Sequence, residues 1–180
     1  MTQPWFIAVE RFGRADGAAW DRYVEWSKLD HVEELVSLDA TLCPSALKDI
    51  RDLHGPYVVD ENGNWIFFED LEFLRRELRV GNVEKARVLC VIRNPAAQPI
   101  LSDKLSAFCF LGFDLVEAES GVSALSNCGG WPELDNRELS KCGLLTDHAR
   151  AVDLQVTLAS NHPEEPHADC DVWAIFAELE

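Results

Sequence analysis

Two histidines and a cysteine lie close together near the end of the chain, at His162, His167 and Cys170. Imidazole nitrogen and thiolate sulfur suit a borderline-soft cation such as zinc, so these residues are candidate metal ligands. Their spacing is not that of a zinc finger, and a fourth ligand would have to come from a distant segment. The competing interpretation is a rigid polar loop between a helix and a strand. On that interpretation we expect no cofactor, with zinc as the alternative.

The thiol of Cys128 is a second candidate for chemistry, because Gly129 and Gly130 follow it directly. Glycines allow backbone N–H groups to approach a developing oxyanion, and His162 or His167 could deprotonate the thiol. A cysteine beside two glycines is also an ordinary turn composition, and no cysteine-protease signature surrounds it. A metal-dependent or cysteine-dependent enzyme that uses the loop from His162 to Cys170 is therefore the alternative function.

The common enzyme motifs are missing from the sequence. It contains no Gly-x-Gly-x-x-Gly, no phosphate-binding Gly-Lys-Ser/Thr loop, no His-Glu-x-x-His and no Gly-x-Ser-x-Gly. Adjacent acids such as Glu33 and Glu34 are expected by chance among 32 acidic residues, and adjacency does not create the opposed carboxylates of a glycosidase. These observations favour a binding protein over an enzyme.

The charge balance is the most unusual global property. There are 32 Asp and Glu residues against 16 Lys and Arg, which gives a formal net charge of −16. Such a protein repels phosphate backbones and anionic membrane surfaces, so we expect neither nucleic acid nor a membrane as partner. The acidity either keeps the protein soluble or steers its association with a basic partner.

The function that we predict from these observations is that of a non-enzymatic acidic binding protein. It could be an immunity or inhibitor-type protein that neutralises a basic protein partner such as a toxin. Exposed carboxylates would steer the encounter, and Trp or Tyr side chains would bury at its centre. The candidate partner-binding carboxylates are Glu133, Asp135, Glu138, Glu164 and Glu165. The identity of the partner and the oligomeric state stay open.

The six cysteines and the N-terminal residues bear on the cellular compartment. No Cys-x-x-Cys pair occurs, and the first residues show no basic region followed by an apolar run. No apolar stretch approaches the ~20 residues that span a bilayer. Free thiols in a reducing compartment are the consistent interpretation, so we predict a cytoplasmic protein.

Apolar periodicity predicts four helices. Over residues 69–79, acids occupy the first turn and arginines the last, which complements the helix dipole, and Gly81 follows. Thr146 is predicted to cap a helix over residues 149–159. The other two predictions are residues 18–28 and a helix that starts at Pro44 and runs to residue 53.

Runs of β-branched and aromatic residues predict the strands. Asn62-Gly63 favours the positive φ angles of a tight turn, which predicts a hairpin over residues 57–68. Residues 113–117 and 122–125 are predicted to pair across Gly121, with Asp114 and Glu117 in solvent. Further strands are predicted at residues 5–9, from Leu35 to residue 39, at residues 86–92 as a central strand, and at residues 171–179.

Hairpins mixed with interspersed helices predict an α+β fold. We expect a single domain over residues 1–180, in which several helices pack on a mixed or mostly antiparallel sheet. The chain is 47% hydrophobic and has six tryptophans distributed from end to end, so the core is expected to draw on the whole length.

Overall fold

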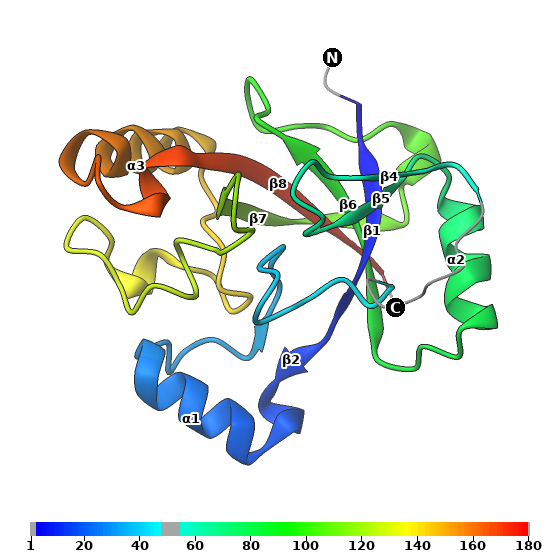
Figure 1. The fold of residues 1–180 in the computed structure, drawn as a ribbon, viewed down its shortest axis with the longest axis horizontal. Coiled ribbons are helices and arrows are strands. Elements are labelled where there is room, and N and C mark those ends of the chain that lie inside the picture. The colour runs from blue at the N-terminus through cyan, green and yellow to red at the C-terminus, as the bar shows by residue number, and fades with distance from the viewer. Residues whose placement is uncertain (1–2, 48–54, 180) are drawn as a thin grey trace.

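A computed structural model describes residues 3–47 and 55–179, which form a six-stranded antiparallel sheet and three α-helices (Figure 1). The strand order is β4-β5-β1-β6-β8-β7, so the first and last long strands both lie inside the sheet. The predicted α+β class is confirmed. The strands are β1 (Trp5–Glu10), β4 (Tyr57–Val59), β5 (Ile66–Phe68), β6 (Ala86–Arg93), β7 (Phe108–Glu117) and β8 (Cys170–Glu178). A second, two-stranded sheet joins β2 (Phe12–Gly13) to β3 (Glu34–Leu35).

Two strand predictions rest on strong local signals and are confirmed. β4 and β5 pair antiparallel, with Val59 opposite Ile66, and the Asn62-Gly63 turn joins them. Gly63 has a φ of 72°, which is the conformation that the turn requires of a glycine. β6 pairs with β1 on one side and with β8 on the other. This is the central position that its apolar run predicts, since both faces of such a strand are covered.

The three described helices are α1 (Ala18–Ser27), α2 (Leu71–Val80) and α3 (His148–Asn161). An aspartate caps the start of α2 and of α3, whereas α1 follows Gly17 and has no side-chain cap. The Asp70 carboxylate accepts a hydrogen bond from the N–H of Phe73 at 2.8 Å and so satisfies one free donor of the first turn of α2. Asp147 caps α3 in the same way through the N–H of Arg150, at 2.8 Å. The prediction of Thr146 as the cap was wrong by one residue.

The two faces of the sheet are covered differently. All three helices place side chains in the larger hydrophobic cluster, among them Tyr23 of α1, Leu74 of α2 and Leu154 of α3. The smaller cluster lies on the other face, because Trp173 and Ile175 alternate along β8 with residues of the larger one. Segments 36–38 and 142–144 contribute to the smaller cluster, and within residues 3–47 and 55–179 no helical residue is buried in it.

The strand predicted from Leu35 to residue 39 is found only at Leu35, in β3. Two further local predictions differ from the structure. Residues 122–125 do not form a strand, and only Ser123 pairs with Val116, in an isolated bridge. Residues 44–47 are not helical, because Ser45 pairs with Val9 at the edge of β1. The rest of the helix predicted after Pro44 falls on residues 48–54, outside the described residues. At residues 44–47, pairing with a distant strand replaced the local preference. At residues 122–125 the Ser123 hydroxyl accepts from the N–H groups of Leu125 and Ser126, which favours a turn over a strand.

Among the described residues, none of the helices has the length and apolar character that crossing a membrane requires.

Candidate functional site

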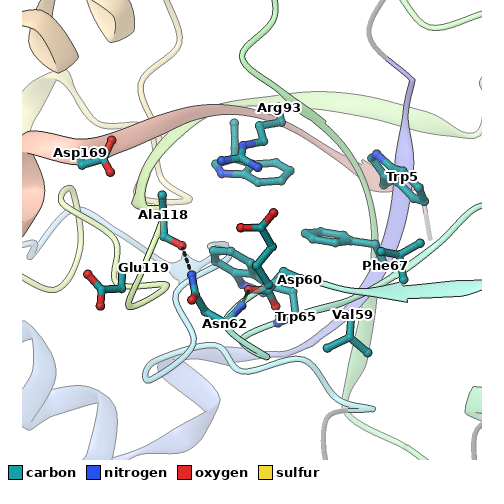
Figure 2. A pocket seen from close by; sticks show the side chains of 13 residues that line it. Trp5, Val59, Asp60, Asn62, Trp65, Phe67, Arg93, Ala118, Glu119 and Asp169 are labelled. Atoms are coloured by element: carbon teal, nitrogen blue, oxygen red, sulfur yellow. Dashed lines mark hydrogen bonds between the residues drawn. The ribbon is translucent and has the colours of Figure 1, made fainter.

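A cleft of about 510 Å³ opens on the face of the sheet that carries the smaller hydrophobic cluster (Figure 2). This size is within the range of small-ligand sites. We call it the aromatic cleft. Its lining residues are Trp5, Val58, Val59, Asp60, Glu61, Asn62, Trp65, Phe67, Arg93, Ala118, Glu119, Asp169 and Trp173.

Four aromatic rings from three strands or their flanks form the apolar wall of the cleft. Phe67 stacks on Trp173 with ring centroids 5.5 Å apart and an interplanar angle of 17°. Trp65 lies 5.9 Å from the same indole, and Trp5 lies 6.3 Å from Phe67. The Trp65 indole N–H donates to the carbonyl of Leu38 at 2.6 Å, which fixes its ring. The wall is therefore a rigid set of π faces.

Carboxylates surround this wall. Asp60, Glu61, Glu119 and Asp169 line the cleft, whereas Arg93 is the only basic residue among the described lining residues. Glu61, Glu119 and Asp169 are exposed at the surface. Four carboxylates against one guanidinium make the local field strongly negative, which favours a cationic ligand.

Hydrogen bonds hold the acidic rim in place. The Asp60 carboxylate accepts from the N–H groups of Asn62, at 3.1 Å, and Trp65 at the two sides of the hairpin turn. The Asn62 amide donates to the carbonyl of Ala118 at 2.9 Å, the contact drawn in Figure 2. Asn64 donates to the carbonyl of Glu119 at 3.0 Å. The β4–β5 turn is thereby joined to the segment that follows β7, and the cleft lies between them.

Arg93 shows how this surface accommodates a cation. Its guanidinium lies over the Trp173 ring, 5.8 Å from the centroid, and its Nε donates to Asp171 at 2.7 Å. Cation–π attraction of this kind is worth ~0.5–2 kcal/mol, depending on desolvation. The indole N–H of Trp173 is buried without a hydrogen-bond partner among the described residues.

The aromatic cleft was not predicted from the sequence, in which the tryptophans indicate core residues and Asp60–Asn64 indicates a turn. The rings of Trp5, Trp65 and Trp173 belong to β1, β5 and β8 or their flanks, and the strand order brings these together. The acidic composition of the Asp60–Asn64 turn was the only local feature of the sequence that could have indicated the cleft.

The five carboxylates predicted to bind a partner lie elsewhere, around α3 and the loops beside it. Glu138 pairs with Arg150, whose hydrogen bond lowers the pKa of that carboxyl. Glu133 accepts from Asn161 at 3.0 Å, which lowers its pKa. Asp135 caps a short 3-10 helix through the N–H of Arg137. Glu164 and Glu165 are exposed. Three of the five therefore have roles within the fold, and two remain available to a partner.

The three predicted metal ligands make different polar contacts, although both imidazoles pack on Trp131. His162 contacts Glu133 at 3.1 Å and packs on Trp131, while Cys170 is buried at the start of β8. His167 instead contacts Cys128 and Glu117. The part of the chain that the structure describes holds no group of three or more His, Cys, Asp or Glu side chains placed to bind a metal ion. The structure thus adds no support to the zinc hypothesis.

Asp114 and Glu117 are buried, with 1% and 4% of their surface exposed, so their predicted place in solvent was wrong. Asp114 accepts hydrogen bonds from the hydroxyls of Ser37 and Ser123, each at 2.6 Å. Burial raises the pKa of Asp114 to about 6, against the lowering effect of those hydrogen bonds. The segments around Ser37 and Ser123 cover this part of β7. The alternation of apolar and polar residues along the strand could not predict this burial, because it does not show which loops pack on the strand.

No family model, no curated protein and no solved structure matches this chain in the three comparisons with known proteins.

Proposed function

We propose that this protein is a binding protein for a basic protein partner, and that the aromatic cleft receives a cationic side chain of that partner. The observation that carries the proposal is the combination of four aromatic rings with four carboxylates around a cleft of about 510 Å³. Aromatic faces attract guanidinium and ammonium groups, and the carboxylates complete the electrostatic complement.

The overall charge supports the same kind of partner. A net charge of −16 accelerates the encounter with a basic protein and disfavours acidic competitors. The cleft would then provide the central anchor, since buried aromatic pockets that hold an arginine or lysine dominate the energy of many interfaces. A stoichiometric inhibitor or immunity protein that neutralises a basic toxin needs both fast association and a central anchor. We propose that this protein neutralises its basic partner in this way.

Glu61 and Glu119 provide the test, since both are exposed on the cleft rim. The double variant Glu61→Gln/Glu119→Gln is expected to bind poly-L-arginine about tenfold more weakly than the unmodified protein, because it loses two charges beside the aromatic wall. Titration calorimetry at low and high salt measures the affinity. Tryptophan fluorescence reports on the rings of the cleft in the same samples.

Glu164→Gln/Glu165→Gln is the matched control, because it removes the same charge from two exposed glutamates outside the cleft. This variant should retain the affinity and the fluorescence change. Equal weakening in both variants would mean that poly-L-arginine binds the acidic surface without preference for the cleft. Loss in the control variant alone would locate binding at the loop beside α3.

A further inference from the structure

Cys128, His167 and Glu117 lie in a row on the other face of the sheet from the aromatic cleft. The Cys128 Sγ is 2.8 Å from the Nε2 of His167, and the His167 Nδ1 contacts the Glu117 carboxylate. Cys128 and the neighbouring Trp131 pack against the larger hydrophobic cluster, whereas the cleft rings Trp65 and Trp173 belong to the smaller one. The row is therefore a separate site, independent of the proposed function.

The surroundings hold the imidazole of His167 in one orientation. Glu117 is the last residue of β7, paired with Cys170 of β8, and its second carboxylate oxygen accepts from the hydroxyl of Ser120. The edge of Trp131 meets the His167 ring at 5.0 Å and 85°. His167 itself lies in a 3-10 helix, Pro166–Asp169, that leads into β8. A fixed imidazole between a thiol and a carboxylate is the geometry of an activated nucleophile.

The contacts assign a direction to proton transfer. When the His167 Nδ1–H donates to the Glu117 carboxylate, Nε2 is the nitrogen that can accept the proton of the thiol, whose other acceptor is the Ser123 carbonyl at 3.2 Å. Burial, followed by the charge of Glu117, raises the pKa of the Cys128 thiol, so the resting group is neutral. The thiol therefore loses its proton to His167 as it attacks, in the manner of a general-base mechanism.

The backbone beside the thiol is open to a reacting group. Cys128 is half-buried, while Gly129 and Gly130 are exposed and have φ angles of 72° and 97°. Their N–H groups make no hydrogen bond to a described residue. A Cβ at Gly129 would find its nearest neighbour, Trp26, 3.9 Å away, which leaves space on this side of the thiol. Free backbone donors beside a nucleophile can stabilise an oxyanion.

We propose that Cys128 is an acyl-accepting nucleophile for small esters or thioesters, with His167 as its general base and Glu117 as the residue that positions the imidazole. The Cys128 Sγ attacks the carbonyl carbon and forms a C–S bond, while its proton moves to the His167 Nε2. The C–O or C–S bond to the leaving group then breaks, and the leaving group takes that proton. The products are an acyl-thioester on Cys128 and the free alcohol or thiol.

The experiment is acetylation by p-nitrophenyl acetate, followed as release of p-nitrophenolate and by peptide mass mapping. Cys128 is expected to be acetylated about 100-fold faster than Cys142, which is also half-buried but has no histidine among its described contacts. The Cys128→Ala variant should lose the fast phase, and the Cys142→Ala variant should keep it. Similar rates at the two thiols in the unmodified protein would overturn the proposal.

The roles of the two partners are tested by substitution. His167→Gln should lower the rate at Cys128 about 100-fold because the general base is lost, and added imidazole should restore part of that rate, a rescue that a purely structural role would not give. Glu117→Gln should lower the rate by less, because the base remains and only its orientation is lost, and Glu117→Asp should retain more of the rate than Glu117→Gln. Circular dichroism checks the fold of each variant. An unchanged rate in folded His167→Gln would also refute the assignment.

Discussion

Replacing Asp114 by alanine is expected to lower the free energy of unfolding by about 4 kcal/mol at pH 5. The carboxylate accepts from the hydroxyls of Ser37 and Ser123 and from the N–H groups of Leu38 and Leu115. Each buried donor left without a partner costs ~1–3 kcal/mol, and the four donors belong to three different segments. Urea denaturation at a fixed temperature measures the loss.

The loss of unfolding free energy in Asp114→Ala should be larger at low pH than at high pH, because the pKa of Asp114 is raised. Burial raises the pKa of this carboxyl to about 6, so the native protein holds its proton more tightly than the unfolded chain does. Its contribution to stability is greatest below pH ~4, the range of an unfolded aspartate, and is lost as the pH rises to about 6. From pH 5 to pH 8 the unmodified protein therefore loses stability on the order of 1 kcal/mol that the alanine variant does not lose.

The expected destabilisation is accordingly about 4 kcal/mol at pH 5 and nearer ~3 kcal/mol at pH 8. Asp153→Ala is the control, since Asp153 is an exposed carboxylate that pairs only with Arg150 on the same helix. It should change stability by less than about 0.5 kcal/mol at both values of pH. If Asp114→Ala lowers the free energy of unfolding by the same amount at pH 5 and at pH 8, the buried carboxyl does not titrate in this range.

The second large effect is expected at Gly112, where β7 is irregular. Its φ of 150° is rare for residues with a side chain, and the register against β8 shifts between Phe110 and Gly112. An added Cβ would lie 2.6 Å from the carbonyl oxygen of Leu145 and 2.7 Å from the Cβ of Leu144. The Leu145 carbonyl also accepts from the N–H of Phe113, so it cannot move freely. Gly112→Ala should therefore cost about 3 kcal/mol or more.

Gly63→Ala separates the two causes of that loss. Gly63 also has a positive φ, 72°, but nothing lies within 4 Å of an added Cβ. Its replacement should cost only the backbone strain, about 1 kcal/mol. Thermal denaturation of the two variants gives the comparison. If Gly112→Ala is no less stable than Gly63→Ala, the close approach of Leu144 and Leu145 to β7 does not constrain the fold.

Local sequence signals predicted the elements whose cause is local. The acidic first turn and leucines of α2, the Asn62-Gly63 hairpin and the apolar run of β6 are confirmed, because caps, positive φ angles and two-sided burial act within a few residues. The helix predicted after Pro44 is wrong at residues 44–47, where pairing with the distant strand β1 outweighed a weak local preference. The strand predicted at residues 122–125 is wrong because only Ser123 pairs with β7, while its hydroxyl accepts from the N–H groups of Leu125 and Ser126 in a turn.

The sequence by itself determined the acidity, the α+β class and the presence of Cys128 among residues with catalytic potential. Only the tertiary structure decided that His167, not His162, contacts this thiol, and that Glu117 is the buried partner of the imidazole. It likewise gathered Trp5, Trp65 and Trp173 into one cleft. The physical reason is the same in each case: these groups are distant in sequence, and they meet because of strand order and the packing of loops onto the sheet.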